Sequence, residues 1–252
     1  PMGYRITNIL FYILTCIMVF FALHRLSTHL RDNGPPGSHE RAALFGALLF
    51  AAHPVHVEAV TWLAARKEGL QGAFFFLAFY LYLKGRDEEG GKKFLYLALV
   101  LLSFLLATLS KPSAIVLPAV FFLYEMSLMK NNWIDFLKRH WFFIVFSIFI
   151  SVLFMYIVMR AMWDAGGIKP YRGGTFFNNL LISFYVLIYN IKLLISTINY
   201  SAAYTIPISN PILSLRTFSF IGITFLLFGL SLWSLKKRRV IFFSFFFFFI
   251  TL

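Results

Sequence analysis

The chain has 252 residues, of which 60% are hydrophobic and only 13% are charged, whereas a soluble domain carries about 25% charged residues. This composition excludes a soluble globular protein. It predicts an all-α fold, a polytopic transmembrane helical bundle, because long apolar runs recur and the strict alternation of a membrane barrel is absent. The net charge of +13 is spread along the chain, so we expect no nucleic acid among its partners. The single cysteine, Cys16, excludes an internal disulfide.

The apolar runs divide the chain into spanning helices of a single membrane domain that covers residues 1–252. We predict spans near residues 4–26, 41–53, 69–84, 94–110, 113–129, 141–160 and 214–235, with an outer loop at 162–211. A last Phe-rich run at 240–252 is too short to cross a bilayer. Because this run stops within a helix and the chain begins abruptly, we expect a fragment of a longer membrane protein.

The distribution of Lys and Arg predicts which connections face the cytoplasm. Basic residues gather in the connections at 24–41, 84–93, 130–140 and 236–239, which we therefore place inside. Alternation then puts residues 53–68, 110–113 and 162–211 on the lumenal or periplasmic side. The sequence thus predicts a multi-pass protein, of the bacterial inner membrane or, in a eukaryote, of the endoplasmic reticulum.

Residues 176–196 do not fit a simple alternation. They are apolar enough to span, but a crossing there would put the basic cluster at 236–239 on the wrong face. Asn179, Asn190 and Tyr185 interrupt the apolar pattern, which is typical of a helix lying in the membrane interface. We predict that this segment lies in the outer interface.

Two histidines and a carboxylate surround a proline where the second span is expected to end. His53 precedes Pro54, and the following proline disfavours helical backbone at residue 53. His56 and Glu58 come directly after the break. Such a group can hold a divalent cation, contact sugar hydroxyls or orient a phosphate. An interfacial cap whose polar groups face water is the alternative.

Cations on the predicted outer face form a second candidate group. Arg66 and Lys67 follow the break, and Lys111 lies in a short connection between two spans. Guanidinium and ammonium groups bind phosphates, so we expect these three to hold a phosphate; contact with lipid headgroups is the alternative. We interpret Glu125, near the inner end of its helix, as a packing residue.

Three motifs carry a resemblance to a known family. The chain has GYRITN at residues 3–8, LLFAAHPVHVEAV at 48–60 and LSKP at 109–112. Together they resemble the membrane domain of the transmembrane and tetratricopeptide-repeat O-mannosyltransferases and their bacterial relatives. Residues 175–207 are similar to the large outer loop of that family, with Tyr200, Ser201 and Pro207 in place. Asn199 stands where the family commonly has an acidic residue.

The resemblance implies a glycosyltransferase of the GT-C type. Such an enzyme moves a sugar from a polyprenyl-phosphate donor to a hydroxyl of an acceptor protein on the outer or lumenal face, while membrane lipids surround it. A carboxylate deprotonates the acceptor hydroxyl, and cations or a divalent metal offset the phosphate charge. The catalytic acidic residue of the family is expected upstream of Pro1, and tetratricopeptide repeats are expected downstream.

The resemblance and the charge pattern together assign roles to individual residues. We expect His53, His56, Glu58, Arg66, Lys67 and Lys111 to line one outer cavity that binds the donor, with Glu58 and His56 as ligands of any metal. Two other functions stay open. A lipid or polysaccharide carrier would use the broken helix for alternating access, and a non-catalytic anchor of a repeat protein would need no outer carboxylate.

Overall fold

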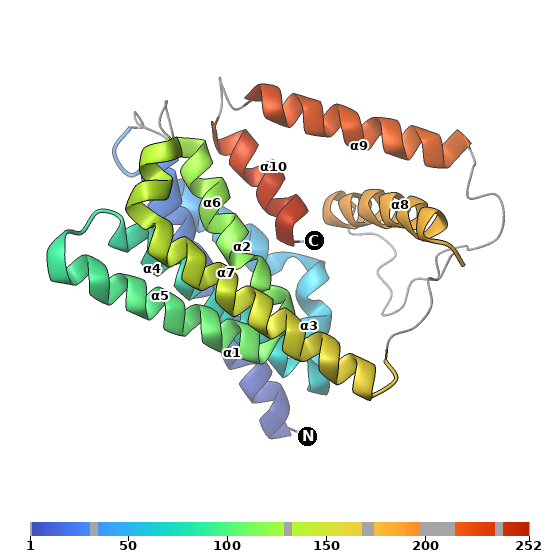
Figure 1. Ribbon diagram of the computed structural model, residues 1–252, viewed down its shortest axis with the longest axis horizontal. Helices are drawn as coiled ribbons and strands as arrows, with labels where there is room; N and C mark the ends of the chain where they lie inside the picture. The colour runs from blue at the N-terminus through green and yellow to red at the C-terminus, as the bar shows by residue number, and fades with distance from the viewer. Residues whose placement is uncertain are drawn as a thin grey trace.

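The structure, a computed structural model, describes residues 2–30, 35–128, 133–167, 174–196, 215–234 and 239–251. Within these residues it contains helices and no strand, which confirms the predicted all-α bundle (Figure 1). The α-helices are α1 (Met2–Leu30), α2 (Ser38–Ala52), α3 (Val57–Thr61), α4 (Arg66–Gly85), α5 (Gly90–Ser110), α6 (Leu117–Leu128), α7 (Trp133–Asp164), α8 (Phe176–Ile195), α9 (Leu215–Ser234) and α10 (Arg239–Thr251). Short 3-10 turns at Pro54–His56, Leu63–Ala65 and Pro112–Val116 join some of them.

Two glycines bring α4 close to α1. A Cβ added at Gly72 would lie 3.0 Å from Cγ2 of Thr15, and one added at Gly69 would lie 3.1 Å from Cβ of Phe11. Small residues let membrane helices approach each other in this way. Inside the contact, the hydroxyl of Thr15 donates to the carbonyl oxygen of Gly69 at 3.0 Å. The first turn of α4 is therefore fixed against α1.

The core lies where α4, α5 and α6 meet. Ala78, Val100 and Leu117 are fully buried there, and the ring of Tyr82 stacks on that of Phe121 at 4.4 Å between centroids. Helix α10 covers this core from the α6 side. Its Phe243 stacks on Phe79 of α4 with an interplanar angle of 8°, so the Phe-rich end of the chain packs as part of the bundle.

Four helical segments among the described residues are long and apolar enough to cross a membrane. They are α1, α5, residues 144–164 of α7, and α8; the pair formed by α2 and residues 54–61, bent by 51°, would be a fifth if it counts as one span. Residues 112–127, 218–234 and 239–251 form shorter apolar helices. The predicted span at 69–84 is helical, but α4, whose first turn carries Arg66, Lys67 and Glu68, is not among these candidate spans.

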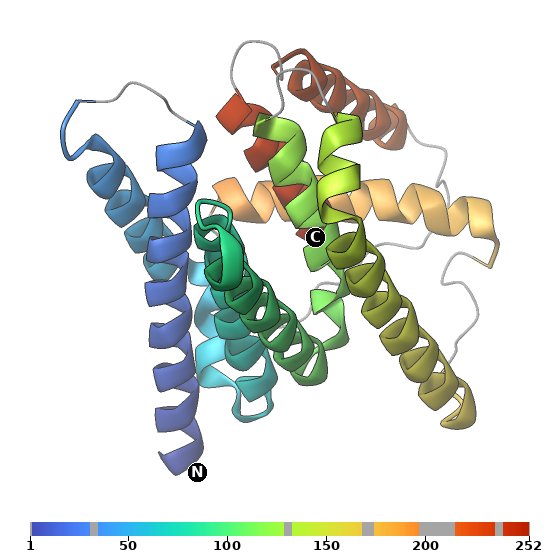
Figure 2. The same cartoon turned by 60° about the vertical axis from the view of Figure 1, so that its left-hand side comes forward.

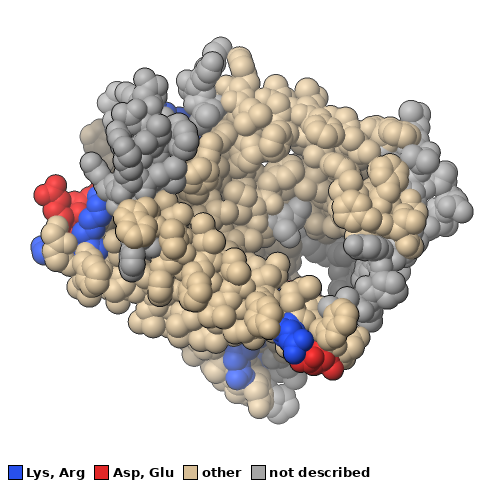
Figure 3. Space-filling model, viewed as in Figure 1, with Lys and Arg blue, Asp and Glu red and all other residues tan. Residues whose placement is uncertain are grey.

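The surface of the bundle fits a lipid environment. Large apolar side chains such as Phe149, Val152 and Phe225 are exposed on α7 and α9. In the view of Figure 3, the described Lys, Arg, Asp and Glu atoms gather near the edges of the molecule and the middle of this face carries none. Several apolar helices with such exposed surfaces support a multi-pass membrane protein.

Several described helices end at one of two opposite ends of the bundle (Figure 2). The start of α1, the break after α2, the end of α5 and the end of α7 lie in the lower part of that view. The end of α1 and the starts of α7 and α10 lie in the upper part. The predicted grouping of outer and inner connections, and the compartment that each end faces, stay predictions.

Charged side chains tie α1, α4 and α6 together at the end predicted to be inner. Asp87 accepts from Arg25 at 2.8 Å and from His29 at 3.1 Å. Glu125, whose side chain is only 4% exposed, accepts from the Tyr82 hydroxyl at 3.1 Å and lies 3.4 Å from Arg86. Burial alone would lower the pKa of Arg86, but the neighbouring Glu125 carboxylate raises it above its usual value, so the guanidinium stays charged. Glu125 is thus a packing and ion-pair residue of the interior.

Helix α8 lies across the direction of α1. In Figure 2 α1 stands upright and α8 is level, and α8 is also level in Figure 1. Its length and hydropathy would allow it to span, so its placement in the membrane interface stays a prediction. The rest of the predicted outer loop at 168–173 and 197–211, including Lys169, Arg172, Asn199, Tyr200, Ser201 and Pro207, lies outside the described residues.

Candidate functional site

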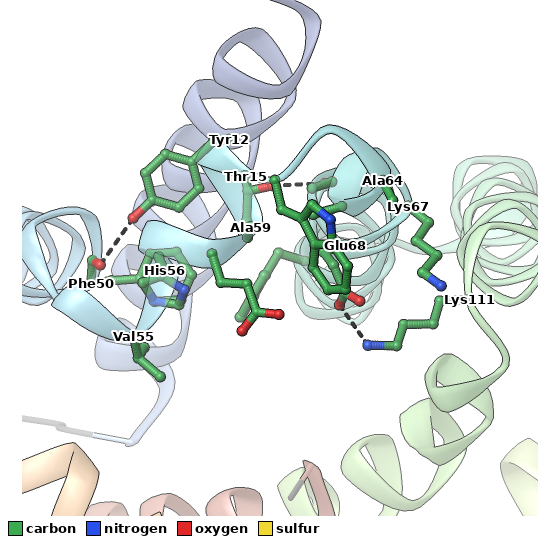
Figure 4. A pocket seen from close by; sticks show the side chains of 16 residues that line it. Tyr12, Thr15, Phe50, Val55, His56, Ala59, Ala64, Lys67, Glu68 and Lys111 are labelled. Carbon is green, nitrogen blue, oxygen red and sulfur yellow. Dashed lines mark hydrogen bonds and ion pairs between the residues drawn. The ribbon is translucent and has the colours of Figure 1, made fainter. Parts of the chain in front are cut away.

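A cavity of about 570 Å³ opens beside the break that follows α2. Its walls come from α1, from residues 50–59, from the first turns of α4 and from the connection after α5 (Figure 4). One group of lining side chains is aromatic and consists of Tyr12, Phe50, Trp62 and Phe76. The charged group consists of Glu58, Lys67, Glu68 and Lys111. We call this cavity the outer pocket.

Proline at residue 54 explains why α2 ends here. Pro54 has no N–H, so it cannot donate to the Phe50 carbonyl as the next helical residue would. The backbone at His53 is extended, with φ −71° and ψ 126°. The hydroxyl of Tyr12 on α1 lies 3.0 Å from the carbonyl oxygen of Ala51 and 3.3 Å from that of Phe50. The backbone N–H of His53 already donates to the Phe50 carbonyl at 3.3 Å, so the Tyr12 hydroxyl mainly serves the Ala51 carbonyl at the end of the broken helix.

His53 is not among the residues that line the outer pocket, which differs from our prediction. Its Nδ1 accepts from the backbone N–H of Val55 at 3.2 Å. This leaves Nε2 to carry the ring proton, and Nε2 donates to the carbonyl oxygen of Leu194 at 3.0 Å. Both nitrogens of the ring are thus used to cap the turn at Pro54–His56 and to hold the last turn of α8. His53 acts in the structure as a joint between the broken helix and α8.

His56 lines the outer pocket as predicted. Its ring lies 4.2 Å from that of Phe50 and 5.6 Å from that of Tyr12, between centroids. These aromatic contacts hold the imidazole against the end of α2. The remaining edge of the ring faces the cavity.

Glu58 also lines the outer pocket, from the first turn of α3. The residue is exposed, and within the described part of the chain its carboxylate has no ion-pair partner. The far end of α3 is tied to α1, because the side-chain N–H of Asn8 donates to the carbonyl oxygen of Trp62 at 2.9 Å. The short helix thus presents an unpaired carboxylate on a fixed backbone.

Arg66 does not line the outer pocket, in contrast to the prediction. It is the first residue of α4, and its guanidinium lies 4.7 Å from the centroid of the Tyr4 ring on α1. This contact is a cation–π interaction outside the cavity. The next residue, Lys67, does line the pocket, because successive residues of a helix point in different directions.

Lys111 reaches the outer pocket from the end of α5, where it pairs with a residue that the sequence analysis missed. Its ammonium lies 2.5 Å from the Glu68 carboxylate, and both side chains are about one-third exposed, at 35% and 33%. Figure 4 shows Lys67, Glu68 and Lys111 together on the side of the pocket opposite His56. An acidic residue in a first helical turn is common for reasons of helix stability, so its position alone gave no signal of a pocket.

The residues present give weak support to a metal centre. Among the described residues, no group of three His, Cys, Asp and Glu side chains could hold a metal ion. His56 and Glu58 would supply one nitrogen and one carboxylate, as our prediction assumed. Ions such as Mg²⁺ often take only one or two protein carboxylates and complete their shell with water and substrate phosphate. A divalent cation in this pocket would therefore require ligands from the donor.

Several curated proteins are similar in sequence to the chain. Protein O-mannosyl-transferase TMTC3 of Mus musculus is 30% identical over 126 residues, and the human TMTC3 protein is 28% identical over 131 residues. Protein O-mannosyl-transferase TMTC4 of Mus musculus is 33% identical over 96 residues. These alignments cover 50%, 52% and 37% of this chain, but only 12–13% of each relative.

The other comparisons return no match. No protein-family model matches the chain, and no solved structure does. The curated relatives are therefore the comparison that bears on the predicted resemblance. The predicted resemblance is thus confirmed, since over about half of its length the chain is similar to protein O-mannosyltransferases of the TMTC family.

Proposed function

We propose that the chain is the membrane part of a GT-C type glycosyltransferase that moves a sugar from a polyprenyl-phosphate donor to a protein hydroxyl. The similarity to proteins named O-mannosyl-transferases supports this function. The outer pocket is the observation that carries the proposal, because it gathers ammonium groups, carboxylates and aromatic rings in one cavity of about 570 Å³ at a membrane helix break. We place this pocket on the outer or lumenal face.

The charges of the outer pocket suit a phosphodiester headgroup. Lys67 and Lys111 offer two ammonium groups, and lysine binds phosphate as a point charge. Glu58 and Glu68 balance them, so the formal charge of the pocket is zero. A donor with one phosphate, bearing a single negative charge, needs less compensation than a diphosphate would.

The remaining lining groups suit the sugar and its transfer. Glu58 and His56 can accept or donate hydrogen bonds to sugar hydroxyls, and aromatic rings such as Trp62 offer an apolar surface beside them. A divalent cation, if bound, would offset phosphate charge next to Glu58 and His56. The lysines would act in the same way by stabilising the charge of the departing lipid phosphate.

Replacing Glu58 with Gln tests this function. We expect Glu58→Gln in the full-length protein to lower kcat/KM for sugar transfer by roughly tenfold or more, because a carboxylate hydrogen bond to the donor contributes about 1.5–3 kcal/mol. Transfer is measured with a polyprenyl-phosphate sugar and an acceptor protein in reconstituted vesicles. The matched control is Glu89→Gln, which changes an exposed carboxylate at the opposite end of the bundle and should leave transfer unchanged.

Two results would contradict the proposal. One is a wild-type protein that is folded and inserted but transfers no sugar from any polyprenyl-phosphate donor. The other is a Glu58→Gln variant that transfers at the wild-type rate.

A further inference from the structure

The ion pair between Glu68 and Lys111 lies in the wall of the outer pocket. Lys111 ends α5 with an extended backbone, φ −154° and ψ 127°, and Pro112 follows it. Glu68 comes from the first turn of α4. Each backbone is therefore fixed by a helix end, and the 2.5 Å contact between the two side chains crosses the gap between α4 and α5.

The pair is not needed to hold α4 and α5 together. About one-third of each side chain is exposed, and ion pairs in contact with water add little to stability. The two helices already meet along their length, for example where a Cβ on Gly85 would lie 2.6 Å from Cβ of Tyr96. A pair that is solvated, lines a cavity and adds little stability is free to take part in binding.

The ammonium group of Lys111 can donate hydrogen bonds to Glu68 and to a ligand at the same time. An ammonium group has three N–H donors, and the contact with Glu68 uses one of them. The other two can donate to phosphate oxygens in the cavity. Because the lysine stem has several rotatable bonds, a fixed acceptor such as Glu68 decides where the ammonium lies before a ligand arrives.

We propose that Glu68 is a positioning residue that holds the Lys111 ammonium in place for the donor phosphate. This inference rests on the proposed function and assigns a role to a carboxylate that would otherwise repel the ligand. Electrostatics alone predicts that removing Glu68 strengthens the binding of an anion. Positioning predicts the opposite as long as Lys111 is present.

A double-mutant cycle separates the two effects. In the wild-type background we expect Glu68→Gln to raise the KM for the donor by roughly two- to fivefold, the contribution of one partly exposed charge pair. In the Lys111→Met background, Glu68 has no lysine to position and only repels the phosphate. There the same substitution should lower the KM by a similar factor.

The experiment measures donor KM and kcat for the full-length protein in vesicles, with Glu89→Gln as the charge-matched control. Glu68→Asp keeps the charge on a shorter stem, so its KM should lie between those of the wild type and Glu68→Gln. If Glu68→Gln does not fold, Glu68→Asp takes its place in the test.

A change of KM in the same direction in both backgrounds would overturn the inference. A lower KM in both would indicate simple repulsion, and a higher KM in both would indicate a structural role for Glu68. These results differ from failure of the proposed function, in which the wild-type protein transfers no sugar at all.

Discussion

Single polar side chains make the helix break beside the outer pocket possible. Inside a membrane protein, unpaired backbone carbonyls are costly unless another donor reaches them. Tyr12 supplies such a donor to Ala51, the backbone N–H of His53 donates to Phe50, and the His53 ring caps the turn that follows. The break is thus maintained by side chains from α1 and from the break itself. This lets residues 54–65 form a wall of the pocket instead of continuing α2.

Removing the Tyr12 hydroxyl should destabilise the protein. We expect Tyr12→Phe to lower the free energy of unfolding by about 1–2 kcal/mol, because it leaves the Ala51 carbonyl of α2 without a donor while the ring stays in place. Thermal unfolding in detergent measures the change. Tyr4→Phe is the matched control, since Tyr4 lies on the same helix and its ring is more than half exposed. Equal stability of the two variants would contradict the role of the hydroxyl.

The sequence could not predict which individual side chains point into the outer pocket. From the motifs at residues 48–60 and 109–112 we predicted that His56, Glu58 and Lys111 line one cavity. The structure places all three around one cavity. His53, within the first motif, and Arg66, shortly after it, do not line this cavity. Hydrogen bonds to Val55 and Leu194 hold the His53 ring, and Tyr4 holds the Arg66 guanidinium, and these contacts could not be derived from the sequence. The importance of Glu68 became clear only from its pairing with Lys111.

At the scale of helices, the contact between α1 and α4 positions the charged side of the outer pocket. The glycines of α4 allow a separation from α1 that larger residues would not. This places the first turn of α4, with Lys67 and Glu68, beside the break held by Tyr12. The pocket therefore depends on the packing of two helices as much as on its lining residues.

A larger residue at Gly72 should disturb this contact. We expect Gly72→Leu to destabilise the protein by about 1–3 kcal/mol, because its Cβ would press on Thr15, whose hydroxyl is held by Gly69. Gly222→Leu in α9 is the matched control, since a Cβ there meets nothing within 4 Å. Thermal stability in detergent should fall for the first variant only. Loss of stability in both would show that the effect is not specific to the α1–α4 contact.

Some of the helices could be predicted from the sequence to within a few residues, whereas the run predicted at 141–160 lies inside the longer helix Trp133–Asp164. The apolar runs predicted at 4–26, 94–110 and 214–235 became Met2–Leu30, Gly90–Ser110 and Leu215–Ser234. Apolar runs fix such helices because every backbone group must be paired within lipid. The amphipathic pattern of residues 176–196 could not fix the direction of α8, since direction follows from packing against other elements.

At the scale of the whole molecule, the two ends of the bundle differ in chemistry. The end predicted to be outer holds the pocket, whereas the other end ties α1, α4 and α6 with ion pairs around Asp87 and Glu125. The placement of α8 decides whether the Lys and Arg residues of all the predicted inner connections lie on one face of the membrane. If α8 crossed the membrane, the basic cluster at 236–239 would face the same side as the outer pocket, against the expected distribution of Lys and Arg.

Accessibility labelling of the two ends of α8 tests this placement. We expect cysteines introduced by Phe176→Cys and Ile195→Cys, in a Cys16→Ser background, to react with an impermeant thiol reagent from the same side of sealed vesicles. Both residues are exposed, and a helix of 20 residues is about 30 Å long, enough to separate its ends across a bilayer if it spans.

Glu89→Cys, at the end predicted to be cytoplasmic, is the control and should react only after the vesicles are opened. Labelling of positions 176 and 195 from opposite sides would show that α8 spans. The predicted interfacial placement of α8, and with it the assignment of the faces after residue 196, would then be wrong. Labelling from one side would leave the last turn of α8 beside His53, in the interface at the edge of the outer pocket.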